Sequence, residues 1–189
     1  MQRLFVYGTL KPGQERYGPL EKYCNGRNVE LNPRPATTAG LLYALDHGYP
    51  GLMKQEPGDK KTLVQGHILN IDSDPAIVGV LNSIEGFNPF QLHNTFTPQR
   101  MYATVEYEDA PGLTSDVDIA CWCYYYHPLA LEDYFKAAKD PIWNGKTKAP
   151  ILLESGNWDA NNDYFDTLSG IHEEQFPPRP AETKGDCNG

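Results

Sequence analysis

The chain has 189 residues, of which 40% are hydrophobic and 22% charged, which fits one globular domain or one domain with an extension. Its net charge of −9 argues against nucleic acid or an anionic membrane as the main partner, because phosphate binding needs a basic face. The sequence shows neither an apolar run of the roughly 20 residues that span a membrane nor the pattern of a signal peptide. A cytoplasmic protein is therefore expected.

The first third of the chain predicts three strands joined by long loops. The strands are expected where apolar residues gather between turn residues, at 3–7, 38–45 and 62–72. The remaining segments are rich in Gly or Pro or have no regular pattern, and they are 8–20, 21–37 and 46–61.

A helix is predicted next, with clear signals at both ends. Ser73 or Asp74 can cap its start, and Pro75 suits its first turn. The apolar residues of the segment share one helical stripe, at Ile77, Val80, Leu81 and Ile84. Glu85 follows the stripe directly, and Gly86 is a helix stop.

The rest of the chain predicts two long strands and a second helix. A loop over 87–99 is followed by strands at 100–108 and 116–127, both with alternating apolar residues, and by a helix at 129–139. We expect three regions: a core over 1–127, an extension over 128–176 that packs on the core, and a flexible tail over 177–189. Strands that are neighbours along the chain, with few helices, predict an α+β fold with a small curved sheet or barrel.

The four cysteines, Cys24, Cys121, Cys123 and Cys187, are too few for a disulfide scaffold at this length. Cys121 and Cys123 are two residues apart in a predicted strand, so both face one side of the sheet. No histidine stands at ligand spacing beside them, and buried reduced thiols are expected rather than a metal site.

Two loops have the composition of a binding site. In "VYGTLKPG", Gly8 allows the backbone to approach a ligand closely, and successive N–H groups of the loop can form a nest for a carboxylate. In "GYPGL", two glycines around Pro50 make a tight turn. Each segment taken alone is also compatible with an ordinary turn.

Glu85 is the candidate for acid–base chemistry. It lies at the border of the buried stripe, and the C-terminal end of a helix is a poor place for an anion. Partial burial would raise its pKa from about 4.3 toward the range of a general base. The alternative is a solvated glutamate at a helix end. In the run Tyr124 to Tyr126, alternation sends Tyr125 to one face of the strand and its two neighbours to the other.

Taken in order over residues 4–126, these segments resemble the γ-glutamylcyclotransferase superfamily, including its γ-glutamylamine cyclotransferase and AIG2-like branches. The segments that carry the resemblance are "VYGTLKPG", "GLLYAL", "GYPGL", "VQGHIL", "VLNSIEG", "RMYATVEY" and "ACWCYYY". The resemblance implies a small mixed β-barrel with flanking helices and no metal or organic cofactor. It also implies cyclisation of a small-molecule γ-glutamyl substrate to 5-oxoproline with release of the attached amine.

The resemblance also implies a role for individual residues. Glu85 is the expected general acid/base. The expected substrate-binding residues, of which the first four would cradle the substrate carboxylate, are Tyr7, Gly8, Thr9, Leu10, Tyr49, Pro50, Gly51 and Tyr124.

Three positions depart from the family pattern. Asn82 replaces an aspartate, His67 a glutamate and Pro98 a tyrosine, whereas Arg100 is kept. These departures leave two alternatives open: a non-catalytic small-molecule binding module on the same fold, and related acyl or amine chemistry on a biosynthetic γ-glutamyl compound.

Overall fold

The computed structural model describes residues 2–46, 48–56, 62–71, 74–91, 94–110, 113–139 and 149–159, with the backbone alone described at 108–110 and 113. Its elements in chain order are β1 (Gln2–Val6), α1 (Tyr17–Asn25), β2 (Arg34–Ala39), β3 (Leu41–Leu45), β4 (Tyr49–Met53), β5 (Leu63–Ile71), α2 (Pro75–Ile84), β6 (Phe96–Ala110), β7 (Leu113–Tyr126), α3 (Pro128–Lys139) and β8 (Ile151–Leu152). Among the described residues, no helix is long and apolar enough to cross a membrane.

Five strands close into a barrel in the order β1-β5-β2-β6-β7. Four of the pairings are antiparallel, and the barrel closes where β7 pairs with β1 in parallel, with Trp122 opposite Leu4. A smaller sheet has the order β4-β3-β8. The predicted α+β fold with a small mixed barrel and flanking helices is therefore confirmed.

Alternation along the barrel strands separates two hydrophobic clusters. Phe5 of β1, Val64 of β5 and Cys123 of β7 belong to the cluster that fills the barrel. Leu4 and Val6, which alternate with Phe5, point to the opposite side and join the cluster beneath the helices. The alternation predicted for the two long strands is confirmed, because Tyr125 lies in the barrel cluster and its two neighbours lie in the other.

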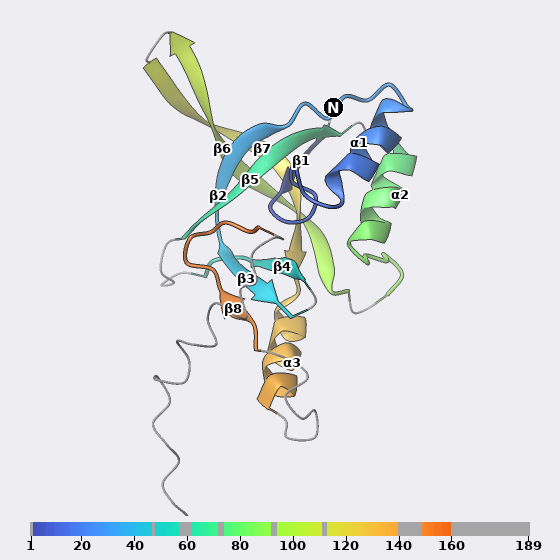
Figure 1. Cartoon of the computed structure of the whole chain (residues 1–189), viewed down its shortest axis with the longest axis vertical. Helices are drawn as coiled ribbons and strands as arrows, with labels where there is room; N and C mark the ends of the chain where they lie inside the picture. Colours follow the sequence, from blue (N-terminus) through green and yellow to red (C-terminus); the bar gives the residue numbers. More distant parts are fainter. Residues whose placement is uncertain are drawn as a thin grey trace, which may run out of the picture.

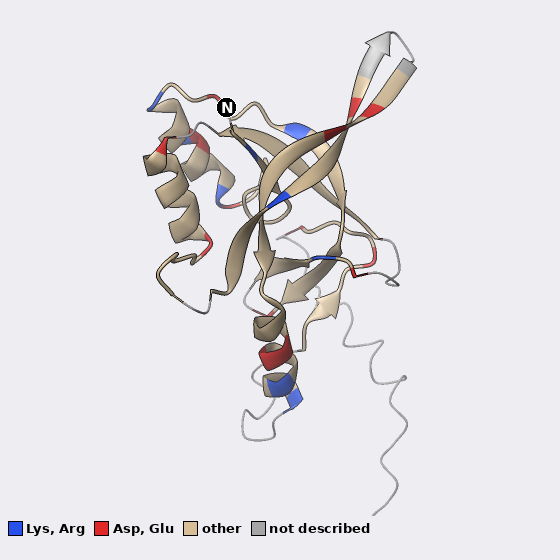
Figure 2. Ribbon diagram, turned by 180° about the vertical axis from the view of Figure 1, so that it is seen from behind, with Lys and Arg blue, Asp and Glu red and all other residues tan. Residues whose placement is uncertain are grey.

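The helices α1 and α2 lie side by side on one flank of the barrel (Figure 1). Their buried residues, Leu20 and Cys24 of α1 and Ile77 and Leu81 of α2, belong to the cluster beneath them. The hairpin of β6 and β7 extends past the barrel at one end, α3 lies at the other end, and acidic residues line part of that hairpin (Figures 1 and 2).

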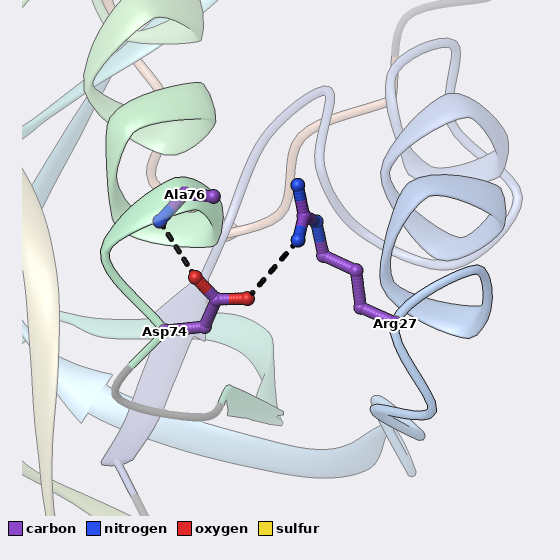
Figure 3. A network of polar contacts seen from close by, with 3 residues as sticks. All are labelled: Arg27, Asp74 and Ala76. Carbon is purple, nitrogen blue, oxygen red and sulfur yellow. Dashed lines mark hydrogen bonds and ion pairs between the residues drawn. The ribbon is translucent and has the colours of Figure 1, made fainter.

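The helix predicted after residue 73 is confirmed as α2, and its cap is Asp74. One carboxylate oxygen of Asp74 accepts a hydrogen bond of 2.8 Å from the N–H of Ala76, and the other lies 3.4 Å from Nη1 of Arg27 (Figure 3). The helix ends at Ile84, and Gly86 adopts a φ of 64°, which only glycine takes up freely.

The local structure of five segments was predicted wrongly. The segments 8–20 and 21–37 contain α1, whose start has neither an acidic residue nor a capping side chain to signal a helix. The strand predicted at 38–45 is divided at Gly40, where a Cβ would meet Cδ1 of Leu52 at 2.6 Å. The loop predicted at 46–61 contains β4, and the loop at 87–99 contains the start of β6.

The described part of the predicted extension contacts the core. β8 pairs with β3, and Leu153 and Trp158 are buried in the cluster that fills the barrel. The domain boundaries at 127 and 176 stay predictions, and the tail over 177–189 lies outside the described residues. Cys24, Cys121 and Cys123 are free and buried, as expected, whereas Cys187 lies outside the described residues.

Candidate active site

A pocket of about 230 Å³ lies between the end of β1, the start of β4 and the end of α2. The residues predicted from the sequence that line it are Tyr7, Gly8, Thr9, Leu10, Tyr49, Pro50, Glu85 and Tyr124. The fold therefore brings together two loops, a helix end and a tyrosine that are up to 117 residues apart in the chain. The roles expected for these residues stay predictions.

The loop after β1, residues 7–13, is held by hydrogen bonds of its own and by the end of the described chain. The N–H of Lys11 donates to the carbonyl of Gly8 at 2.9 Å, and the N–H of Arg16 donates to the carbonyl of Thr9 at 2.9 Å. The buried Lys11 ammonium donates to Oδ1 of Asn157 at 2.9 Å and to the carbonyl of Trp158 at 2.6 Å. Residues 157 and 158 thus help to fix the loop that borders the pocket.

Glycines in both loops allow close packing of the protein on itself. A Cβ on Gly8 would lie 2.6 Å from Cγ of Pro50, so the first loop packs directly on the second. Gly51 is not among the residues that line the pocket, and a Cβ there would lie 3.0 Å from the ring of Tyr126. Gly51 therefore affects the pocket wall indirectly, because the absence of a side chain there lets Tyr126 pack closely against it.

Two tyrosines of the pocket have their hydroxyl groups engaged within the protein. The buried hydroxyl of Tyr7 donates to the carbonyl of Tyr124 at 2.8 Å and accepts from the N–H of Leu52 at 3.4 Å. The hydroxyl of Tyr124 donates to Oδ1 of Asn82 at 2.6 Å. Asn82 itself does not line the pocket, and its departure from the family pattern gives the pocket residue Tyr124 a neutral acceptor in place of a carboxylate.

Glu85 occupies the position after the last residue of α2, and its N–H donates to the carbonyl of Leu81 at 3.0 Å. Its side chain is half-buried in the pocket wall. Burial raises the pKa of the carboxyl to about 7, and the positive charge of Arg16 opposes that rise. A carboxyl that titrates near neutral pH can accept a proton and return it within one reaction.

Arg16 is the main residue of the pocket that sequence analysis missed. It lines the pocket, and its Nη1 donates to the carbonyl of Ile84 at 3.1 Å. Thr95 and Phe96 also line the pocket, from a segment predicted to be a loop. The sequence around Arg16 has no periodicity, so no local signal distinguished this arginine from a surface residue.

The other two departures are also not among the residues that line the pocket. His67 borders a separate groove beside Lys11 on the barrel wall, and burial together with the charge of Lys11 lowers its pKa. Pro98 stands opposite Tyr124 in the pairing of β6 with β7, and the guanidinium of the retained Arg100 lies 5.3 Å from the ring centre of Trp122. Neither departure removes a residue that lines the pocket.

The sequence model of the family described as gamma-glutamyl cyclotransferase, AIG2-like, matches residues 4–160. The chain belongs to this family, and the match extends beyond the segments on which the resemblance rested. No protein of curated function matches the sequence.

Several solved structures are similar to this chain. An AIG2-like protein from Mus musculus has a TM-score of 0.52 and 21% identity, over 86% of this chain and 91% of that one. A protein specific to uropathogenic E. coli has a TM-score of 0.49 and 14% identity, over 93% and 98% of the two chains. An uncharacterised protein from Pyrococcus horikoshii has a TM-score of 0.43 and 13% identity, over 94% and 100%. The likeness to the mouse protein supports the fold.

Proposed function

We propose that this protein cyclises the γ-glutamyl group of a small amine or peptide to 5-oxoproline and releases the amine. The observation that carries the proposal is the half-buried Glu85 in one pocket with the loop of residues 7–10. Membership of the gamma-glutamyl cyclotransferase, AIG2-like family supports the reaction class.

For this reaction the protein must mainly hold the substrate in a bent conformation, with its amine close to its γ-carbonyl. The α-amine of the γ-glutamyl group attacks the γ-carbonyl carbon of the same residue and closes a five-membered ring. Holding two groups of one molecule in a reactive orientation contributes about 7–11 kcal/mol to catalysis. A small pocket between two loops that pack directly on each other suits this task.

In this proposal Glu85 moves the proton. An α-ammonium with a pKa of about 7.7–8.0 is mostly protonated at neutral pH, and a carboxylate with a pKa of about 7 can accept its proton at a cost of about 1 kcal/mol. The free amine forms the new C–N bond. As the bond between the γ-carbon and the leaving nitrogen breaks, Glu85 returns the proton to that nitrogen. Glu85 then takes the second proton from the attacking nitrogen, which becomes the N–H of the neutral lactam, and passes this proton to the released amine or to solvent. The products are the lactam and the amine, and no water is consumed.

The remaining residues of the pocket would bind and orient the γ-glutamyl head. The backbone N–H groups of residues 8–10 are the proposed donors to the substrate carboxylate. Tyr49 and Tyr124 would form walls, and Pro50 would keep the second loop against the first. Tyr7 would have a structural role, because the hydrogen bonds of its hydroxyl group connect the end of β1 to β7 and β4.

The experiment is incubation of the full chain with γ-glutamyl amines, γ-glutamyl amino acids and γ-glutamyl peptides. The expected result is formation of 5-oxoproline and the free amine in equal amounts from at least one class, measured by chromatography with mass detection. Binding of these compounds without any 5-oxoproline would overturn the proposal in favour of a non-catalytic binding module.

A further inference from the structure

The charge inside the pocket is limited to two side chains of opposite sign. Among the described residues that line it, Arg16 and Glu85 are the ones with a formal charge. A γ-glutamyl head carries an ammonium and a carboxylate on the same carbon atom. A pocket with one cation and one anion is complementary to such a head, and Glu85 is already assigned to the ammonium.

We propose that the Arg16 guanidinium binds the α-carboxylate of the substrate and makes the pocket selective for compounds with a free α-amino acid head. This inference rests on the proposed function, since it concerns the same pocket and the same substrate class. It adds a charged partner to the backbone N–H groups of the loop.

The position of Arg16 in α1 has no explanation in helix stability. Arg16 is the N-cap residue, its side chain makes no capping hydrogen bond, and a cation at this end opposes the helix dipole. Asn, Asp, Ser or Thr is preferred at such a position. A residue that breaks the local rule at a pocket wall is typical of a functional constraint.

The contact of Arg16 with α2 places its charge beside Glu85. The guanidinium has five N–H donors, and the hydrogen bond of 3.1 Å to the carbonyl of Ile84 uses one of them. That contact does not use the other four. The N–H of Arg16 also bonds to the carbonyl of Thr9, which fixes the residue to the loop of the pocket. A guanidinium held in this way can offer two parallel donors to a carboxylate.

The other cation of the loop is already engaged. The Lys11 ammonium donates to Oδ1 of Asn157 and to the carbonyl of Trp158, and Lys11 does not line the pocket. Arg16 is therefore the cation that the described part of the chain offers to a carboxylate in this pocket.

The test separates charge recognition from a structural role of Arg16. Wild type, Arg16→Gln, Arg16→Lys and Arg27→Gln are compared for binding of 5-oxoproline and of 2-pyrrolidinone, which is the same lactam without the carboxylate. Kinetic constants are measured in parallel for a γ-glutamyl amide and for the matching 4-aminobutanoyl amide. Arg27 is the matched control, because it also links the α1 region to α2 but lies outside the pocket.

Wild type should prefer the compound with the carboxylate by about 10- to 100-fold, as expected for hydrogen bonds to a charged group. Arg16→Gln should lose most of that preference through KM, Arg16→Lys should keep part of it, and Arg27→Gln should keep all of it. A merely structural role would weaken both compounds of each pair equally. Thermal melting of each variant establishes that it is folded.

The outcomes distinguish this inference from the proposed function. Turnover with an unchanged carboxylate preference in folded Arg16→Gln or Arg16→Lys overturns the role of Arg16 and leaves the reaction intact. Binding of 5-oxoproline that depends on Arg16, without turnover of any γ-glutamyl compound, supports the role of Arg16 and overturns the reaction. If wild type shows neither binding nor turnover, both are wrong.

Discussion

Each end of α2 has an acidic residue with an arginine from the α1 region nearby, but the surroundings of the two ends differ. At the start, Asp74 caps the helix and pairs with Arg27 at 3.4 Å, and the two side chains are 31% and 41% exposed (Figure 3). At the end, Glu85 is half-buried in a pocket, and Arg16 donates to the carbonyl before it.

The comparison separates an acid that stabilises the helix from one that does not. The helix dipole and a backbone N–H both favour the charge of Asp74. At Glu85 the dipole and burial both oppose the charge, and burial raises the pKa to about 7. A carboxyl kept where folding disfavours it is typical of a reactive group.

The largest expected effect is on the rate. Glu85→Gln keeps the shape of the side chain but cannot take up a proton, and loss of a general base typically lowers the rate by about 10²–10⁴-fold. Asp74→Asn is the matched control at the other end of α2, and its turnover should equal that of wild type. Formation of 5-oxoproline by Glu85→Gln at a near-wild-type rate would remove Glu85 from the mechanism.

The pH dependence of kcat/KM should report the titration of Glu85. Because the base acts in its deprotonated form, activity should fall as the pH drops below about 7. Arg16 lowers this pKa, so Arg16→Gln should move the acidic limb to higher pH, whereas Arg27→Gln should leave it in place. Burial, with a smaller contribution from the charge of Glu85, raises the pKa of Tyr7, Tyr49 and Tyr124, so these tyrosines stay neutral in this range. An acidic limb that is the same in wild type and Arg16→Gln would contradict this assignment.

The free energy of unfolding should depend on pH, because the negative charge of Glu85 destabilises the folded protein. Its pKa is raised in the folded state, so between about pH 4.5 and 7 the folded protein holds a proton that the unfolded chain has lost, and stability falls as the pH rises. Glu85→Gln should therefore be more stable than wild type at pH 8, on the order of 1–2 kcal/mol, with a smaller difference toward pH 5. Denaturant unfolding at several pH values measures this, and a constant difference would contradict the buried charge.

The smallest expected effects lie at the start of α2. Asp74→Ala removes a helix cap and should lower the free energy of unfolding by about 1 kcal/mol with unchanged turnover. Arg27→Gln breaks an exposed ion pair and should cost about 0.2–1 kcal/mol. Thermal unfolding with a parallel activity assay tests both. A large loss of activity in either variant would show that the two ends of α2 are coupled.

The site could be predicted from the sequence where single segments carry the signal. The stripe of α2 with its cap placed Glu85 at the border of a buried face, and the glycine after Tyr7 marked a shaped loop. The position of Gly51 could not be predicted in this way, because its neighbour is the ring of Tyr126, 75 residues further along the chain. Tyr7 lines the pocket, so its place at the substrate stays a prediction, and its hydroxyl is engaged by the protein itself.

The sequence by itself determined the strands and the helix whose residues follow a period. Alternation in β6 and β7 separates the residues that fill the barrel from those beneath the helices, since side chains of a strand face opposite sides in turn. The spacing of apolar residues determined α2, since residues three and four apart share one face of a helix. These features depend on local geometry, which a short segment already contains.

The tertiary structure alone decided the elements and contacts without a local signal. The helix α1 forms although its start is poorly capped, because Leu20 and Cys24 are buried against the barrel. The same packing sets α1 beside α2 and thereby brings Arg16 to the carbonyl of Ile84 and into the pocket with Glu85. The proximity of Arg16 to Glu85 depends on packing that brings Arg16 to Ile84, 68 positions further along the chain, and no pattern within either segment encodes it.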